Sequence, residues 1–461
     1  MNKSTIKLNF SVKRKEDLKE LSYEELLKYV ENLTDNLVVE KPKKDSTNSS
    51  KAPSSDMGIT PKKNQSLREK SDKSSGGQFG HKGKTLMQSK IPDEIVELAY
   101  TLNSCKECNS DLSDVLKQLK EKRQVLDLDL ADIKSKITQY QSYSKLCSNC
   151  GYDNHDNNYP AFVTSYISYG KNIMAIVSYL SSVHYLSYGR IVLAMKSLYG
   201  ISISEGTVDT IIKRSSKYSQ VEIEKIKQQL TLSDIVGIDE TGCKVNGQRY
   251  WHWAFQNENS TLIVANKSRG TKVITDTFAD GFVNACVVHD NYSSYSSLVA
   301  KDEQLCLAHK LRDLNYAIEC DNTQVMKDIK QLIQEAMLDH KENIIPPHRE
   351  ILKEKYLNLL DLLLETSSIA KSQTHKQLKS FSKARDKIFT FLLYPTVPPD
   401  NNGSERAIRN VKVKLKVSGQ FKSEQGAIDY ANLRSIVDTS RKRGLNEFEA
   451  LRDVISGVGV F

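Results

Sequence analysis

The spacing of apolar residues changes several times along the chain, and each pattern predicts a different kind of structure. Residues 16–40 carry leucines near helical spacing, which predicts a short amphipathic helix that packs on a core or pairs with a second copy of itself. Residues 91–150 alternate apolar and polar residues, as short strands do. From about 160 to 230 the spacing is again helical. The N-terminal half is therefore expected to hold a helix, a strand-rich module and a helical region.

Two helices joined by a tight turn are predicted inside this helical region. Gly189–Gly200 has the pattern of a helix closed by its last glycine. The second helix, within Ser202–Arg214, is expected to be capped by Ser202 or Ser204. Two helices with a glycine in the turn between them are typical of a helix-turn-helix motif. The pair is predicted to bind DNA, and ordinary helical packing is the alternative.

Residues 231–300 change to the pattern of a sheet. Ile235–Ile238 is continuously apolar, as in a strand covered on both faces, and it leads directly into Asp239. Asn246-Gly247 predicts a two-residue hairpin turn to a second strand. The rest of this region is predicted as a strand, a short helix and a strand, at Thr261–Ala265, 271–279 and Val283–Val288. A mostly helical segment follows from about 306 to 395, before Pro398–Asn402 interrupts it and starts another helix.

The composition is that of a soluble protein with more than one domain. The 461 residues are 39% hydrophobic and carry 66 basic and 57 acidic side chains, and at roughly 100–200 residues per domain they predict two to four domains. No run approaches the roughly 18 apolar residues of a membrane helix, and the N-terminus lacks the pattern of a secretory signal. We therefore expect a cytoplasmic protein with no membrane partner.

Most of the positive charge lies in residues 41–90, where twelve basic residues stand against four acidic ones. The segment is rich in Ser, Gly, Pro and Asn and poor in large apolar residues, which predicts a flexible linker that does not fold alone. A flexible basic arm binds a polyanion by releasing counterions from its phosphates, and Lys82 and Lys84 are candidate DNA contacts. A solvated linker without a ligand is the alternative.

Two C-x-x-C knuckles bracket the strand-rich module. They are Cys105 with Cys108 and Cys147 with Cys150. Each knuckle presents two sulfurs from one tight turn, so the two together can enclose one Zn²⁺ in a tetrahedron. In a reducing compartment, a metal explains this pairing better than disulfides do. We predict one structural zinc, with strands inserted between the knuckles.

Three acids at the ends of predicted elements are candidates for catalysis. Asp239 ends the first strand of the sheet, Asp290 ends the fourth, and Glu405 lies early on the helix that starts near Asn401 or Asn402. Converging carboxylates repel one another unless a cation neutralises them, and oxygen-only ligands suit Mg²⁺ or Mn²⁺. Two such ions roughly 3.5–4 Å apart can activate a water or a 3′-hydroxyl for attack on a phosphodiester. The sequence therefore predicts a site that cuts and joins nucleic acid.

Each acid also has a purely structural interpretation. Asp239 or Glu240 can be a turn residue at a strand end, and Asp290 can cap the helix that follows it. Glu405 stands three residues after Asn402, which is the spacing of a capping box. Strand alternation allows only one of the adjacent acids Asp239 and Glu240 to point at a metal.

Short motifs follow one another in order along almost the whole chain. They are Asn48–Asp56, Gly76–Gly83, the two cysteine knuckles, Asp239–Thr241, Asp290–Tyr295, Cys306–His309 and Asp400–Arg406. In this ordered series the chain resembles the transposases of insertion sequence family 66, which carry an RNase H-like DDE catalytic core. Ala52 and Phe79 stand where proline is expected, which bears on the stiffness of the linker and leaves the chemistry unchanged.

The resemblance implies a multidomain α/β protein whose RNase H-like mixed sheet is interrupted by a helical insertion. It also implies that Asp239, Asp290 and Glu405 bind two catalytic Mg²⁺ or Mn²⁺ ions and that the knuckle cysteines hold zinc in a zinc-ribbon-like module. The predicted regions are an N-terminal helix (1–40), a basic linker (41–90), a zinc module (91–158), a helical DNA-binding region (159–230) and a catalytic domain (231–461) with its insertion at about 310–395.

A run of cations follows Glu405 with no acid until Glu424. On a helix Arg409 shares the face of Glu405, while Arg406 turns away. We interpret the run as a clamp for DNA phosphates, and a surface helix with solvated lysines is the alternative. The candidate DNA contacts are Arg406, Arg409, Lys412, Lys414, Lys416 and Lys422.

The expected function is that of a DNA transposase that cleaves at transposon ends and transfers the freed strand into target DNA. Two alternatives are a zinc-containing DNA-binding regulator without catalysis and a nuclease without strand transfer. Expected partners are double-stranded DNA, at least a second copy of the chain and accessory proteins, at the nucleoid if the host is bacterial. Cys306-x-x-His309 supplies only two metal ligands, so a structural role, or a contact near the catalytic pocket, is favoured for His309 over a second zinc.

Overall fold

A computed structural model describes most of the C-terminal two thirds of the chain. The described residues are 168–295, 297–341, 346–365 and 372–461, together with short pieces at 6–8, 22, 24–25, 27–28, 37–39, 44, 111, 144–146 and 153–155. The predicted zinc ligands and two of the predicted DNA contacts lie outside the described residues: Cys105, Cys108, Cys147, Cys150, Lys82 and Lys84.

Four helices form the first part of the described chain. They are α3 (Lys171–Ser182), α4 (Tyr188–Tyr199), α5 (Glu205–Tyr218) and α6 (Gln220–Thr231). Gly200 ends α4 in the left-handed conformation at φ 65°, and the Ser204 hydroxyl caps α5 by accepting the Thr207 N–H at 3.1 Å. These two observations confirm the predicted pair of helices and select Ser204 over Ser202 as the cap.

The sheet has five strands. They are β5 (Ile235–Val245), β6 (Gln248–Gln256), β7 (Thr261–Asn266), β8 (Phe282–His289) and β9 (Ala300–Leu305), in the order β7-β6-β5-β8-β9. β5, β6 and β7 are antiparallel, whereas β8 and β9 run parallel to β5. Asn246 and Gly247 turn the first hairpin with φ values of 46° and 77°, as predicted. α7 (Lys272–Thr277) matches the predicted short helix.

Strand β9 was not predicted from the sequence. Its sequence, Ala-Lys-Asp-Glu-Gln-Leu, is polar and carries no strand signal of its own. It pairs in parallel with β8 at the edge of the sheet and leads the chain to Leu305 and the helices that follow. Pairing with a neighbouring strand therefore decides this element, and the local sequence does not.

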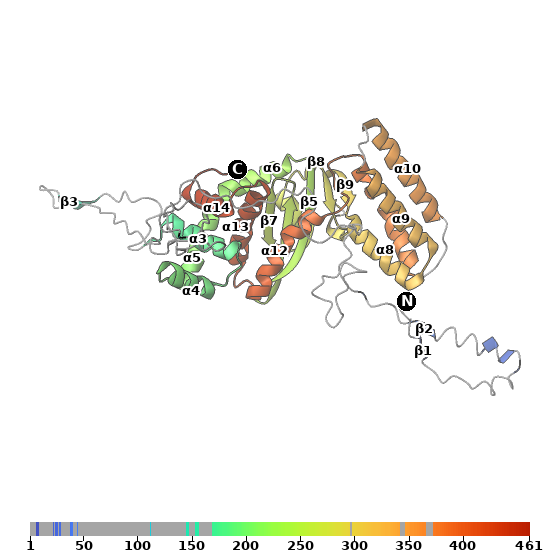
Figure 1. Cartoon of the computed structure of the whole chain (residues 1–461), viewed down its shortest axis with the longest axis horizontal. Coiled ribbons are helices and arrows are strands. Elements are labelled where there is room, and N and C mark those ends of the chain that lie inside the picture. Colours follow the sequence, from blue (N-terminus) through green and yellow to red (C-terminus); the bar gives the residue numbers. More distant parts are fainter. Residues whose placement is uncertain are drawn as a thin grey trace. The chain divides into compact units, whose positions relative to one another are not determined.

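The segment from about 306 to 395, predicted to be mostly helical, is helical and starts directly after β9. It contains α8 (Leu307–Asp321), α9 (Gln324–Asp339), α10 (Pro346–Glu365) and α11 (Gln373–Lys383). These helices build their own apolar core, which also takes in Cys286, Val288 and Leu305 of the sheet. Figure 1 shows α8, α9 and α10 next to one another beyond β9. The Leu307 N–H donates to the Pro399 carbonyl at 2.9 Å, so the insertion leaves the sheet and returns at the same place.

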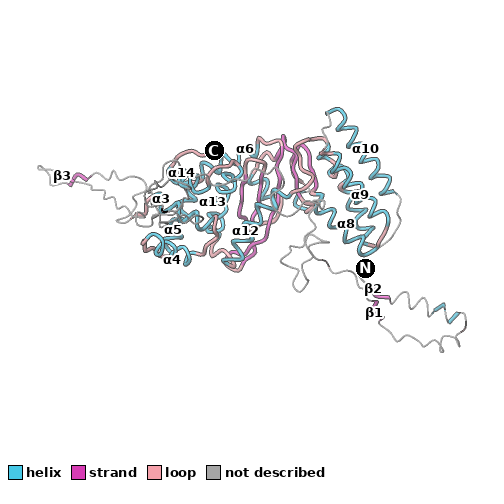
Figure 2. Tube along the Cα trace, viewed as in Figure 1, coloured by secondary structure: helices cyan, strands magenta, loops and turns pink. Residues whose placement is uncertain are grey.

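Three helices complete the chain: α12 (Asn402–Ser418), α13 (Glu424–Lys442) and α14 (Glu447–Ser456). α12 packs on β5 and β6, and α13 packs on β7. A continuous core joins the helices of residues 171–231 to the sheet and to α13, with Met174, Trp253 and Ile436 among its buried members. Figure 2 shows the strands with helices on either side. The helical region is thus built directly onto the sheet.

Short elements are also described nearer the N-terminus. β1 (Ile6–Leu8) pairs antiparallel with β2 (Leu37–Val39), so the predicted helix over 16–40 does not include its last residues, whose β-branched valines favour a strand. Inside the range 16–40, residues 24–25 and 27–28 are helical, and Ser22 forms a capping box with Glu25 just before and within them. β3 (Ser144–Leu146) pairs with β4 (Asp153–His155), and the two strands flank the second cysteine knuckle in the sequence.

None of the described helices has both the length and the apolarity to span a bilayer.

Candidate active site

The adjacent acids Asp239 and Glu240 lie on opposite faces of β5. Glu240 is buried, and both of its carboxylate oxygens accept hydrogen bonds. The Arg269 guanidinium donates to one oxygen from Nε at 2.8 Å and from Nη2 at 2.7 Å, and the Tyr295 hydroxyl donates to the other. Asp239 shares its face with Gly237, which lies against the start of α12. Within the described chain, the Asp239 carboxylate accepts one hydrogen bond, from the neighbouring Glu240 N–H at 2.9 Å. Asp239 is therefore the acid that faces α12.

Asp290 lies level with Asp239 on the neighbouring strand. Gly237 pairs with Val288 in the parallel register of β5 and β8, and each acid stands two residues further along its own strand direction. Alternation then puts both carboxylates on the same face of the sheet. Asp290 Oδ1 also accepts the Tyr292 N–H at 3.0 Å, which forms a turn ahead of the short 3₁₀ helix Ser293–Tyr295. In the described chain this bond does not reach an N–H of that helix, so Asp290 is a turn residue beside Asp239 and not the cap of the helix.

Glu405 reaches the site because the start of α12 docks on β5. Asn401 Nδ2 donates to the Ile238 carbonyl at 2.6 Å, and the Ser404 hydroxyl donates to Asn401 Oδ1 at 2.6 Å. Gly237 allows this approach, because a Cβ there would lie 2.6 Å from Ser404 Oγ and 2.9 Å from Asn401 Oδ1. Glu405 sits in the first turn of the helix and does not cap it: Asn401 is the N-cap, and its side chain forms no capping bond.

The three carboxylates influence one another. The pKa of Asp239 is raised well above its ordinary value, first by burial and then by the negative charges of Glu240, Asp290 and Glu405. Glu405 Oε1 is buried and has no hydrogen-bond partner in the described chain. The three carboxylates offer a donor set of oxygen atoms alone, and a buried oxygen without a hydrogen bond beside two further acids fits a hard divalent cation such as Mg²⁺ or Mn²⁺.

Cys306 and His309 lie beside Glu405. One ligand atom from each of the three residues falls within 4.8 Å of the others, and His309 Nε2 is 3.7 Å from Glu405 Oε1. Burial, and then the positive charge of Arg312, lower the pKa of His309. A cavity of about 290 Å³ opens next to them, and Asp290, His309 and Lys310 are part of its lining. His309 is therefore placed at the edge of the candidate active site.

Five of the six predicted phosphate contacts that follow Glu405 are exposed: Arg406, Arg409, Lys412, Lys416 and Lys422. Lys414 is different, and the prediction for it is wrong. Its side chain is buried, its ammonium donates to the Leu186 carbonyl at 3.2 Å, and burial lowers its pKa to about 8. Lys414 therefore anchors α12 to the helices before the sheet and does not face solvent.

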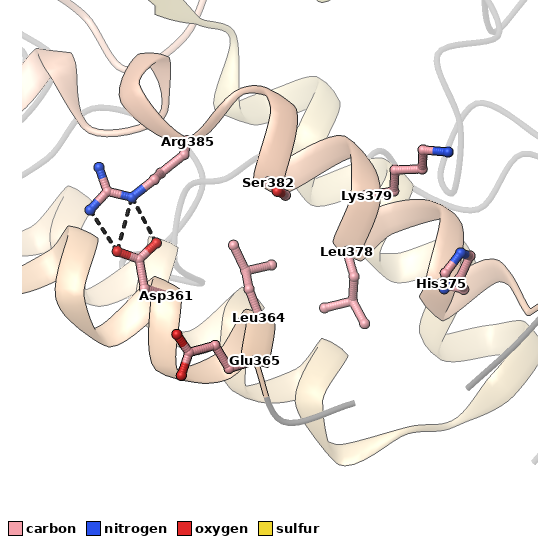
Figure 3. Close-up of a pocket in the computed structure, with 8 residues that line it drawn as sticks. All are labelled: Asp361, Leu364, Glu365, His375, Leu378, Lys379, Ser382 and Arg385. Carbon is pink, nitrogen blue, oxygen red and sulfur yellow. Dashed lines mark hydrogen bonds and ion pairs between the residues drawn. The ribbon is translucent and has the colours of Figure 1, made fainter. Parts of the chain in front are cut away.

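A second hollow of about 580 Å³ lies between α10 and α11 of the insertion (Figure 3). Two of its charged lining residues are paired with each other, because Arg385 holds the Asp361 carboxylate with Nε at 2.7 Å and Nη2 at 2.6 Å. None of the three converging acids lines it. We therefore do not assign a reaction to this hollow.

Comparison with known protein families identifies the chain. Residues 167–429, more than half of its length, match the transposase IS66 family. The chain belongs to this family. The match confirms the resemblance found in the sequence, and it gives this transposase a general role in DNA processing that includes DNA binding. Residues 14–87 match a family of unknown function, DUF6444, and a search of curated proteins finds no match.

The matched segment of this transposase contains all three candidate acids and the residues that position them. Sequence analysis named the acids but missed the scaffold around them, above all Asn401 and Gln256. Gln256 Nε2 lies within 3.4 Å of Ser404 Oγ, and a Cβ on Gly237 or on Gly403 would collide with the Gln256 amide. The local sequence carries no signal for Gln256, because its role depends on two glycines that approach it from other elements.

Proposed function

We propose that this protein is a DDE transposase that cleaves DNA at transposon ends and joins the freed 3′ ends to target DNA. The observation that supports this most strongly is the convergence of Asp239, Asp290 and Glu405 on one face of the sheet. The strand order, with three antiparallel strands followed by two parallel ones, fits the RNase H-like core that such enzymes use.

The three acids would hold the catalytic ions in this proposal. Two Mg²⁺ or Mn²⁺ ions, when bound, activate the attacking oxygen and neutralise charge on the leaving oxygen. Asp239 and Asp290 are fixed by two hydrogen-bonded strands, and Glu405 is fixed by the Asn401 and Ser404 contacts at the start of α12. The protein thus holds its acids in place before DNA arrives, at the cost of the repulsion seen in the raised pKa of Asp239.

The exposed cations of α12 and the residues after it would bind the DNA backbone. Arg406 and Arg409 stand one and four residues after Glu405, so they bring guanidinium groups to the same end of α12 as the proposed metal ligands. Arginine holds phosphate through paired N–H donors, which positions DNA without reading its sequence. Lys412, Lys416 and Lys422 extend the positive surface.

The N-terminal region is also part of this proposal. Cys105, Cys108, Cys147 and Cys150 would hold one structural Zn²⁺, and the basic linker with Lys82 and Lys84 would add DNA contacts. The α4–α5 pair is proposed to bind the transposon ends. Because two ends must be held together, the active form is proposed to contain at least two copies of the chain.

A cleavage and joining assay tests the function. The full-length protein is incubated with Mg²⁺, labelled ends of its own element and a target plasmid. We expect joined products from the wild type, and no reaction but retained DNA binding from Asp239→Asn and Glu405→Gln. Cleavage without joining would instead indicate a nuclease. DNA binding without cleavage by the wild type would indicate a regulator, and loss of binding in both variants would contradict the assigned roles.

A further inference from the structure

Cys306, His309 and Glu405 form a cluster of three different metal-binding side chains. Cys306 is the N-cap of α8, His309 lies in the first turn of α8, and Glu405 lies in the first turn of α12. Their ligand atoms lie within 4.8 Å of one another. Among the residues that the structure describes, they form the only group of three or more His, Cys, Asp or Glu residues with this spacing.

Two backbone contacts fix the starts of these helices against each other. The Asn401 N–H donates to Cys306 Sγ at 3.2 Å, and the Leu307 N–H donates to the Pro399 carbonyl at 2.9 Å. The cluster is therefore held together although 96 residues separate His309 from Glu405 in the sequence. A site that is assembled before its ligand arrives binds more tightly, because little ordering remains to be done on binding.

Two polar atoms of the cluster have no hydrogen-bond partner among the described residues. His309 Nδ1 and Glu405 Oε1 are both buried, and neither forms a hydrogen bond with any described residue. Buried polar atoms are normally satisfied, so these two unsatisfied atoms indicate a ligand at the two side chains, and His309 Nε2, 3.7 Å from Glu405 Oε1, is the ring nitrogen that faces the carboxylate. The pair of ligands found in the sequence, Cys306 and His309, was incomplete, and the fold supplies the third ligand from α12.

We propose that Cys306, His309 and Glu405 form a separate binding site for a borderline-soft divalent cation such as Zn²⁺. A thiolate, an imidazole and a carboxylate are typical zinc ligands, whereas Mg²⁺ prefers oxygen atoms alone. Cys306 gives up its thiol proton to solvent when the sulfur–metal bond forms. Three protein ligands leave one position open, and the cavity of about 290 Å³ beside Cys306 and His309 offers room for a water there.

Occupation of this site affects the active site through Glu405, an inference that rests on the proposed function. Glu405 cannot serve fully as a ligand of zinc and as a ligand of the Mg²⁺ pair with Asp239 and Asp290. Zinc bound by Cys306 and His309 would draw Glu405 away from the other two acids. The transposase would then be inhibited by zinc in competition with Mg²⁺.

Metal binding is tested on the metal-free, full-length protein by titration with Co²⁺ and Zn²⁺. Co²⁺ reports a thiolate ligand through its charge-transfer absorption. The predicted zinc module also binds metal, so each variant is compared with the wild type. We expect Cys306→Ser and His309→Ala to bind one equivalent fewer at the concentrations that fill the wild type, with the affinity of that site lowered about 100-fold. Cys306→Ser is also expected to lose part of the charge-transfer band.

Cys243→Ser is the matched control, because Cys243 is also a buried free cysteine but lies at the far end of β5. It is expected to bind as many equivalents as the wild type. Circular dichroism establishes that each variant is folded. Equal stoichiometry and equal charge-transfer absorption in the wild type and in a folded Cys306→Ser variant would overturn the proposal.

Two further measurements test the competition for Glu405. Bound Mn²⁺, followed by electron paramagnetic resonance, is expected to be released in the wild type by one equivalent of Zn²⁺ beyond the amount that the predicted zinc module takes up, and to require about 100-fold more free Zn²⁺ in Cys306→Ser. The zinc concentration that inhibits Mg²⁺-dependent cleavage is expected to rise by a similar factor. If Co²⁺ binds as described but no preparation cleaves DNA, the metal site stands and the proposed function fails. If Mn²⁺ binding does not respond to zinc, the shared role of Glu405 is refuted.

Discussion

Two neighbouring acids of β5 show how this protein separates stability from function. Glu240 points into the core, where Arg269 neutralises its charge and the Tyr295 hydroxyl donates a hydrogen bond to its second oxygen. Asp239, one residue earlier, faces α12 and is surrounded by other negative charges. The fold therefore compensates the buried charge on one face of the strand and leaves it uncompensated on the other. Uncompensated buried charge is costly, which is why it marks the face where a cation and a reaction are expected.

The largest effect should come from Asp239→Asn, which removes a proposed metal ligand. We expect strand transfer to fall by about 10³-fold or more, because a metal ion supplies several kcal/mol of transition-state stabilisation. Glu240→Gln is the matched control on the other face, and it should retain Mn²⁺ binding. Rates from a single-turnover cleavage assay decide between them. Equal loss of Mn²⁺ binding in both variants would mean that the two faces are not functionally distinct.

Arg269→Met should produce the largest loss of stability. It leaves the buried Glu240 carboxylate without its cation, and breaking a buried pair costs about 3–5 kcal/mol. Because the Arg269 side chain is itself 34% exposed, we expect about 2–3 kcal/mol here. Urea unfolding of the wild type and the variant measures this difference. A change below about 0.5 kcal/mol, the usual range for surface substitutions, would contradict the pairing.

Gly237→Ala tests the contact that carries Glu405 to the sheet. The new methyl group would lie 2.5 Å from Gln256 Nε2 and 2.6 Å from Ser404 Oγ, so the start of α12 must move. Overpacking of this kind costs about 1–3 kcal/mol, and we expect cleavage to fall more than DNA binding does. Gly170→Ala is the control, because a Cβ there meets nothing within 4 Å. If both variants cleave like the wild type, the contact does not position Glu405.

A smaller effect, visible only in the pH dependence of stability, should follow from the charge on Asp239. Burial and the neighbouring acids raise the pKa of Asp239 above the ordinary value of 3.8. The unfolded chain therefore loses this proton at a lower pH than the folded chain, so the folded state is progressively destabilised as the pH rises above about 4. Without divalent metal, Asp239→Asn should then become more stable than the wild type towards neutral pH.

Denaturant unfolding at several pH values measures this difference, and below about pH 4 the two proteins should converge. Adding Mg²⁺ should stabilise the wild type and leave Asp239→Asn nearly unchanged, because a bound cation offsets the repulsion. A variant that is less stable than the wild type at neutral pH would show that Asp239 is paired after all.

The smallest effect concerns two lysines on the same helix. Lys412→Gln removes an exposed cation, so DNA binding should weaken uniformly across sequences and its salt dependence should fall by about one unit of slope. Lys414→Gln should leave that slope unchanged, because Lys414 is buried against the Leu186 carbonyl, and should lower the thermal stability instead. Fluorescence anisotropy over a range of salt concentrations separates the two. A reduced slope in Lys414→Gln would refute its structural assignment.

The local sequence carried enough information for most elements. Apolar runs predicted β5 and β8, Asn246-Gly247 predicted the hairpin turn, and Gly200 predicted the end of α4. Each of these depends on neighbouring residues alone. β9 was missed because its polar sequence becomes a strand only through pairing with β8. Lys414 was misassigned for a similar reason, since only the packing of α12 on the helices before the sheet buries it.

The sequence by itself determined which residues are candidates for the chemistry: two acids at strand ends, a third on a late helix, and a cysteine and a histidine one turn apart. It also determined the family, because the motifs stand in order along the chain. Only the tertiary structure decided that Asp239 rather than Glu240 faces α12, and that Glu405 approaches both Asp239 and His309. The physical reason is that alternation and spacing act between neighbours, whereas the start of α12 meets α8 only after the 96 residues from His309 to Glu405 have folded back, and meets β5 after a still longer stretch.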